Sequence, residues 1–279
     1  MKIPMCRSYT MKTVGRLMPT CALLALTINA AHATIPPNER ATLDALFIHT
    51  GSSAALAGSG WEGPSGSECS WLGITCTTGD DDHVGAIALS SLGLTGTLPD
   101  ISAFTALESF DVSNNAIGGS LPALTRITTL RSFNASHNRF TGSIPSLFEL
   151  RALQTFNVEE NLLDGNAPNL LSLSALRAFL VGNNQLTGPA PIPPDPSVLS
   201  VASSSLCPNF LGPASTPESP TDLIWDDATD NTPWSEGCTA GPVVTATAVA
   251  APTLSLPSLL ALIGLFGIVG GILVRYRET

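Results

Sequence analysis

The middle of the chain repeats with a period of 23 residues, and this constrains the fold more than any other feature. Each full unit has the pattern F-x-hydrophobic-x-x-N-x-hydrophobic-x-G-x-hydrophobic-P, and the four units start at Phe110, Phe133, Phe156 and Phe179. A partial unit precedes them, with Leu92 at the asparagine position. One such unit cannot enclose its own apolar side chains, so the units must stack and share a core. The repeat therefore predicts a solenoid.

The positions within a unit have distinct physical roles. In a short strand Phe110 and Val112 point inward, whereas Asp111 and Ser113 point outward. The repeated asparagine follows the strand, where its amide can pair with backbone groups that the turn leaves free. We therefore expect a structural role for Asn115, Asn138, Asn161 and Asn184.

This pattern resembles the plant-type leucine-rich repeat, with phenylalanine in place of the leading leucine. The resemblance implies an α/β-type solenoid, a short horseshoe arc with parallel β-strands on the concave face, over residues 84–192. Residues 34–83 contain Cys69-Ser-Trp71-Leu-Gly73-Ile-Thr-Cys76, which is similar to the C-x-W-x-G-V-x-C signature of the plant-type N-terminal cap. A cap is expected there because a solenoid end would otherwise expose the core.

Residues 193–238 are expected to hold a degenerate last coil and a C-terminal cap. We align Leu199 and Val201 with the strand of this coil and Ser204 with the asparagine position. Cysteine at 207 would begin the cap, as it often does in relatives of this type, and Cys238 would close it.

The cysteines of the exported part are Cys69, Cys76, Cys207 and Cys238. An even number in an exported segment suggests disulfides, and three pairings are open. The sequences between them favour Cys69 with Cys76 and Cys207 with Cys238, so that each end of the solenoid is closed by a disulfide.

Both chain ends read as targeting segments. Residues 1–33 have basic residues, a short apolar run and a small-x-small exit, which predict a secretory signal peptide starting at Met1 or Met11. A linker over 239–256 leads to the apolar segment 257–274, which is long enough for a short transmembrane helix. The basic tail 275–279 would lie in the cytoplasm, which places the N-terminus outside.

Pro252-Thr253-Leu254-Ser255, followed by the apolar segment and the basic tail, resembles the bacterial IPTL-CTERM sorting signal. This resemblance implies a Gram-negative source and an exosortase-type partner that removes the helix after export. Two outcomes remain open: a retained membrane anchor, or a cell-surface or secreted product.

Charge and composition exclude several functions. Between residues 34 and 256, six arginines and 21 acidic residues give a formal charge near −15, which argues against nucleic acid as a partner. No nucleophile lies in a pattern with a base, and adjacent Glu159 and Glu160 read as solvated carboxylates, so we expect no enzyme and no cofactor. The acidic run 80–82 lacks a calcium-loop spacing, so no metal is expected.

The remaining function is recognition of an extracellular protein or polysaccharide by the concave face. The alternatives are a structural matrix or surface protein in which the solenoid is a spacer, and, by family analogy, an inhibitor of cell-wall-degrading enzymes. The candidate ligand-binding residues are Asp111, Ser113, Asn134, Ser136, His137, Asn157, Glu159 and Asn183.

Overall fold

The computed structural model describes residues 34–51, 56–78, 82–194, 199–212, 220–235 and 237–238. The expected signal peptide, linker, transmembrane helix, sorting signal and basic tail all lie outside these residues. Within the described ranges, no helix is both long and apolar enough to cross a bilayer.

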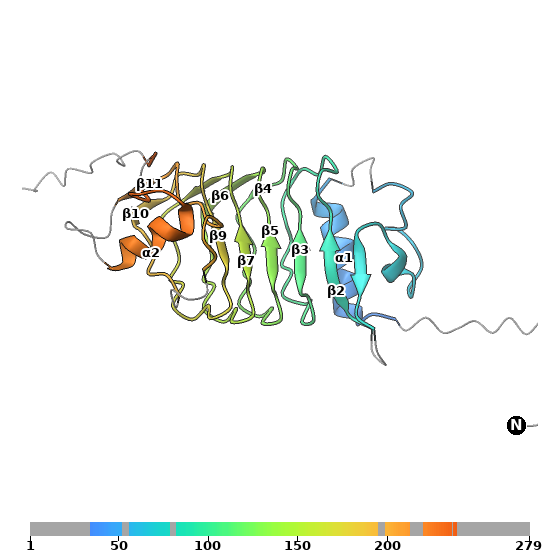
Figure 1. The fold of residues 1–279 in the computed structure, drawn as a ribbon. Coiled ribbons are helices and arrows are strands. Elements are labelled where there is room, and N and C mark those ends of the chain that lie inside the picture. The colour runs from blue at the N-terminus through green and yellow to red at the C-terminus, as the bar shows by residue number, and fades with distance from the viewer. Residues whose placement is uncertain are drawn as a thin grey trace, which may run out of the picture.

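A row of short parallel strands runs along one side of an elongated molecule (Figure 1). Neighbouring strands pair in register at the repeat distance, as in Ser109 with Ser132 and Ser132 with Thr155. The row consists of β2 (Val84–Ala88), β3 (Ser109–Asp111), β5 (Ser132–Asn134), β7 (Thr155–Asn157) and β9 (Ala178–Leu180), and β1 (Ile74–Cys76) pairs antiparallel with β2. These strands confirm the parallel-strand solenoid. We call the outward side of this row, predicted to be concave, the sheet face.

A second set of parallel strands follows the turns, which the sequence did not predict. It comprises β4 (Gly118–Gly119), β6 (Arg139–Ser143) and β8 (Leu162–Asp164), and separately β10 (Thr187–Pro189) with β11 (Phe210–Gly212). The repeated glycine lies in or beside these strands and has a left-handed backbone, with φ 74° in Gly119 and 75° in Gly142. The coil thus has strands on two sides.

The core is built from columns of identical or similar side chains. Four phenylalanines stack along the solenoid with ring centroids 5.6, 5.5 and 5.8 Å apart. Each ring is fully buried, and so are the leucines that precede the strands. These residues are Phe110, Phe133, Phe156 and Phe179, and Leu107, Leu130, Leu153 and Leu176. Stacking therefore removes apolar surface that a single coil would leave in water.

The repeated asparagines tie each coil to the one before it, as expected. Asn138 shows the pattern: its Oδ1 accepts the N–H of Ile117, and its Nδ2 donates to the carbonyls of Val112 and Ala135. We call these residues the ladder asparagines. They satisfy buried backbone groups that the turn leaves without partners.

The last coil has a different register from the expected one. Ser205 pairs with Leu180, where the expected alignment places Ser200, and Val201 is 71% exposed. Asn209 instead of Ser204 continues the ladder, accepting the N–H of Leu186 and donating to the carbonyl of Val181. The expected alignment placed Ser204 only 20 residues after Asn184, whereas Asn209 follows Asn184 by 25, so this coil is two residues longer than the 23-residue repeat.

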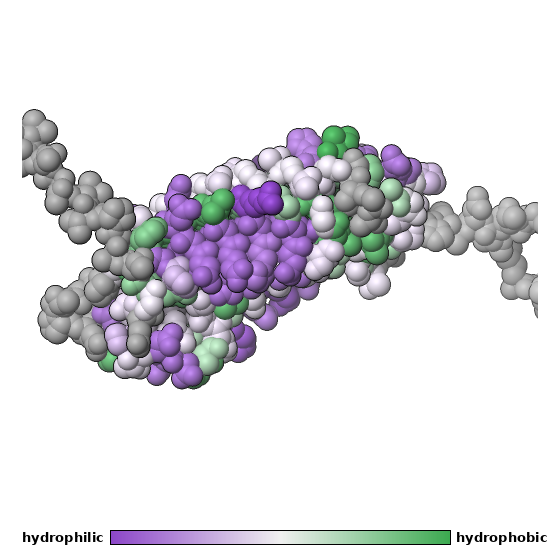
Figure 2. Space-filling model, turned by 90° about the horizontal axis from the view of Figure 1, so that it is seen from above, coloured by the Kyte–Doolittle hydropathy of each residue, from purple (hydrophilic) through white to green (hydrophobic). Residues whose placement is uncertain are grey.

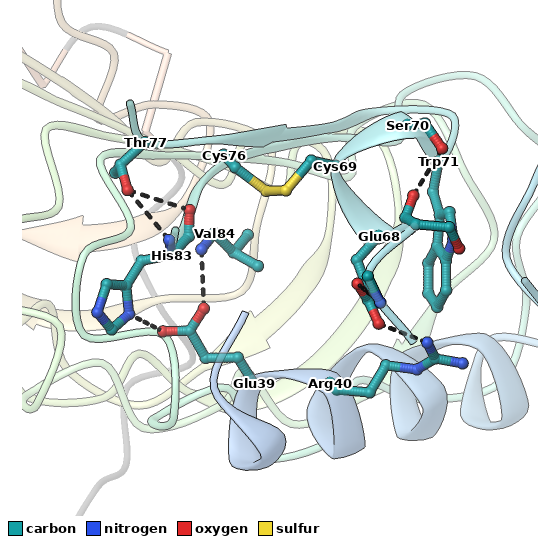
Figure 3. Close-up of a disulfide and its surroundings, with 12 residues drawn as sticks. Glu39, Arg40, Glu68, Cys69, Ser70, Trp71, Cys76, Thr77, His83 and Val84 are labelled. Carbon is teal, nitrogen blue, oxygen red and sulfur yellow. Dashed lines mark hydrogen bonds and ion pairs between the residues drawn. A yellow bond between two sulfur atoms is a disulfide. The ribbon is translucent and has the colours of Figure 1, made fainter. Parts of the chain in front are cut away.

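The N-terminal segment, residues 34–78, packs its helix α1 (Pro37–His49) beside β2 (Figure 1). Leu43 and Leu46 of this helix are fully buried in the common core. The 3-10 helix η1 (Glu68–Ser70) carries Cys69, which forms a disulfide with Cys76, the pairing favoured by the sequence (Figure 3). A second disulfide joins Cys207 to Cys238.

Polar contacts fix helix α1 to the start of β2 and to the rest of this segment (Figure 3). The buried carboxylate of Glu39 accepts the N–H of Val84 and lies 2.7 Å from the imidazole of His83. Arg40 pairs with Glu68 and lies over the ring of Trp71. Burial lowers the pKa of Arg40, but its hydrogen bonds to Glu68 and Asp44 outweigh this effect and the net pKa is raised.

Helix α2 (Pro220–Thr229) lies against the last coil (Figure 1). Trp225 is fully buried beside Phe179, the last ring of the stack, and donates to the carbonyl of Pro191. The backbone N–H groups of Ser203 and Ser204 donate to the carbonyl of Ala228. The helix therefore covers the apolar end of the stack.

Candidate functional site

Three of the predicted site residues form one straight row on the sheet face. Asp111, Asn134 and Asn157 are paired in register on β3, β5 and β7 and are all half-buried. Small polar residues flank them on the same strands, namely Ser109, Ser132 and Thr155. We call Asp111, Asn134 and Asn157 the sheet row.

Hydrogen bonds to the local backbone hold the sheet row in place. The Oδ1 atoms of Asp111, Asn134 and Asn157 accept the N–H two residues on, at 2.9, 3.2 and 3.0 Å. Within the described chain, the Nδ2 groups of Asn134 and Asn157 donate to no protein acceptor. The row thus presents two oriented amide donors and a carboxylate, and little side-chain freedom would be lost on binding.

The predicted site residues two positions after the sheet row are less accessible than expected. Ser113 and Ser136 are only 3% and 4% exposed, so the prediction that they contact a ligand was wrong. They are buried because the chain turns into the solenoid directly after the strand, and the hydroxyl of Ser136 donates to Asn134. Glu159, at the same repeat position, is longer and remains half-buried.

His137 and Asn183 lie at the edge of the sheet face, in the turn after the strand. The residue before each ladder asparagine has a left-handed backbone, with φ between 53° and 56°. We call these residues the edge column: Asn114, His137, Glu160 and Asn183. All four are exposed, so the prediction of His137 and Asn183 as accessible is compatible with the structure, but they do not join the sheet row.

Glu160 belongs to this edge and was missed by the sequence analysis, which treated it as a solvated carboxylate. Its Oε2 lies 2.8 Å from Nδ1 of His137 on the preceding coil. The repeat itself could have predicted the contact between His137 and Glu160, because residues 23 apart in the sequence become neighbours on adjacent coils.

A hollow of about 580 Å³ opens at this edge. It is lined by Asn138, Arg139, Glu160, Asn161, Leu162 and Asn183. Figure 2 looks onto the edge at which the strands of the sheet face end, and shows a hydrophilic patch across the middle of the solenoid. We call the hollow lined by these six residues the edge hollow.

The described residues contain no cluster of potential metal ligands. No group of three or more histidine, cysteine, aspartate or glutamate side chains there is arranged to hold a metal ion. Of the acidic run considered in the sequence, Asp80 and Asp81 lie outside the described residues.

Comparison with known proteins identifies the repeat. A model of the family "Leucine Rich Repeat" matches residues 129–150. A search of curated protein sequences gave no match.

Solved structures with a similar fold are ectodomains of plant receptors. The ectodomain of the membrane receptor kinase GASSHO1/SCHENGEN3 from Arabidopsis thaliana, in complex with CASPARIAN STRIP INTEGRITY FACTOR 2, has 27% identity and a TM-score of 0.56, covering 62% of this chain and 21% of that one. PEPR1–AtPEP1 has 27% identity and a TM-score of 0.56, covering 62% and 25%. The BIR2 ectodomain from Arabidopsis thaliana, with 24% identity, a TM-score of 0.52 and coverage of 67% and 99%, shows the fold alone.

The chain spans about a quarter or less of the length of the first two of these ectodomains. It contains a leucine-rich-repeat domain of about five coils with the architecture of such ectodomains.

Proposed function

We propose that this protein is an exported recognition module that binds a polypeptide partner across its sheet face. The observation that carries the proposal is the in-register sheet row, whose side chains are held by the backbone and present polar groups outward. Two similar ectodomains were solved in complex with CASPARIAN STRIP INTEGRITY FACTOR 2 and with AtPEP1, which supports a protein-recognition role.

The test is a selection from a random peptide-display library on the full-length protein. Peptides that bind the native protein should lose binding to the triple variant Asp111→Ala, Asn134→Ala, Asn157→Ala. The matched control, Arg126→Ala, Glu149→Ala, Arg151→Ala, removes exposed side chains on coil segments away from the sheet face and should retain binding.

Other results would replace the proposal. If no enriched peptide depends on the sheet row, the polypeptide proposal fails, and the solenoid is better described as a spacer in a surface or matrix protein. Binding of a glycan array member that the triple variant abolishes would instead assign the face to polysaccharide.

The proposal includes export and a tether. The two disulfides fit an oxidising compartment outside the cytoplasm. The segments that would direct export and anchoring, residues 1–33 and 252–279, lie outside the described residues. Mass spectrometry of the mature protein tests both: a product that starts near residue 34 supports signal cleavage, and intact residues after Ser255 contradict sorting cleavage.

We also propose that residues 34–78 act as a plant-type N-terminal cap. The support is the burial of Leu43 and Leu46 in the core, together with the buried ring of Trp61 against Trp71 of the Cys69–Cys76 loop. Proteins lacking this segment should expose the apolar side of β2 and aggregate.

A further inference from the structure

The edge hollow contains a cation, Arg139, that forms no ion pair with the described residues. Arg139 is exposed on the edge, and within the described chain its guanidinium makes no ion pair and no hydrogen bond. The one carboxylate among the lining residues is that of Glu160, and its Oε2 lies 2.8 Å from Nδ1 of His137. An arginine with five unsatisfied donors can bind a carboxylate through two parallel hydrogen bonds.

The other lining residues add an amide and an apolar contact. The side-chain amide of Asn183 has no hydrogen-bond partner within the described chain, so it can donate to and accept from one peptide group. Leu162 follows Arg139 by one repeat, lines the same hollow and is 48% exposed. The three side chains come from three successive coils, so their spacing is set by coil stacking.

The volume of the hollow suits a side chain with its adjoining backbone. About 580 Å³ lies within the usual range of small-ligand sites, although this hollow is open along the edge. The ladder asparagines Asn138 and Asn161 form its floor, and their amides are already bonded to the backbone. The floor is therefore rigid, and specificity resides in Arg139, Leu162 and Asn183.

We infer that the edge hollow binds an acidic side chain of the polypeptide partner, with the carboxylate on Arg139, a neighbouring apolar group on Leu162 and the peptide group on Asn183. The inference rests on the proposed function, because it extends the same partner from the sheet row over the edge of the solenoid. The acidic charge of the whole protein acts weakly at this distance, since physiological salt screens exposed charges beyond about 8 Å.

The test uses a peptide enriched by display selection and a synthetic copy in which its aspartate or glutamate is replaced by asparagine or glutamine. Arg139→Gln should weaken binding of the acidic peptide by about ten- to hundredfold and leave the amide copy unaffected. Arg151→Gln, an exposed arginine on another face, is the matched control and should change neither affinity. Arg139→Glu should restore binding of a copy that carries lysine at the same position.

The outcomes separate this inference from the proposed function. If the triple variant of the sheet row abolishes binding but Arg139→Gln has no effect, the sheet face binds the peptide and the edge inference is wrong. If Arg139→Gln lowered the affinity for the acidic and the amide peptide equally, the inference would also be wrong, because Arg139 would then not bind the carboxylate. Binding of a polyuronate, but of no acidic peptide, in an Arg139-dependent way would assign the hollow to a saccharide and contradict the inference.

Discussion

At the scale of single residues, the edge column combines a left-handed backbone with exposed polar side chains. A left-handed backbone is common for asparagine, which stands at positions 114 and 183. The two central coils place His137 and Glu160 in the same conformation, at φ 53°. The same conformation recurs at Asn114 and Asn183, so it belongs to the turn of the repeat, and the side chains are what distinguish these two positions.

Replacing Glu160 by asparagine should therefore not cost stability. Glu160→Asn relieves the left-handed strain and loses only a half-exposed contact to His137, which is worth about 0–1 kcal/mol. The free energy of unfolding, measured with urea, should stay the same or rise by up to about 1 kcal/mol. Glu149→Asn, at an exposed position without positive φ, serves as the control. A loss above about 1 kcal/mol would mean that Glu160 is structural.

The ladder asparagines are the opposite case, with a purely structural role. Asn138→Ala leaves the N–H of Ile117 without a partner inside the solenoid. It also removes one of the donors to the carbonyls of Val112, Ala135 and Ser136. Urea unfolding should show a loss of about 2–4 kcal/mol. Asn134→Ala, four residues earlier on strand β5 of the same coil, should lose about 1 kcal/mol or less. A similar loss for both variants would contradict the assigned role.

At the scale of elements, the strands are too short to be stable alone, because most have only two or three residues. Stability comes from packing between coils, and the phenylalanine stack is its most regular part. Trp225 of α2 closes the stack at its end, so helix and strands depend on the same column of rings.

Shortening one ring should affect the whole stack. Phe133→Ala creates a cavity between two rings and should reduce the free energy of unfolding by about 3–5 kcal/mol, whereas Phe133→Leu, which fills more of the site, should lose less. Phe148→Leu is the control, since that ring is 54% exposed. Thermal unfolding of the three variants measures the effect, and equal midpoints would contradict the packing argument.

At the scale of the whole molecule, the solenoid is nearly one-dimensional, because each coil contacts chiefly its neighbours. Its ends are therefore its weak points. The two disulfides lie there, and the Cys207–Cys238 bond closes the longer loop, with a sequence separation of 31 against 7.

Removing the C-terminal disulfide should open the molecule from that end. The double variant Cys207→Ser, Cys238→Ser should lose about 3–4 kcal/mol, and Cys69→Ser, Cys76→Ser about 2 kcal/mol, from loop entropy. Hydrogen exchange should report the first loss at Asn209 and α2 while the strands β3 and β5 stay protected. Uniform loss of protection along the chain would show that the coils unfold as one cooperative unit.

The sequence by itself determined the repeat, the columns of phenylalanine and leucine, the ladder asparagines and the preferred cysteine pairs, because each follows from spacing along the chain. Only the tertiary structure decided the register of the last coil, where two additional residues shift the ladder to Asn209. It also decided that Ser113 and Ser136 are buried and that Arg139, Leu162 and Asn183 surround one hollow. These facts depend on how far each coil rises and turns before the next begins, which side-chain periodicity does not specify.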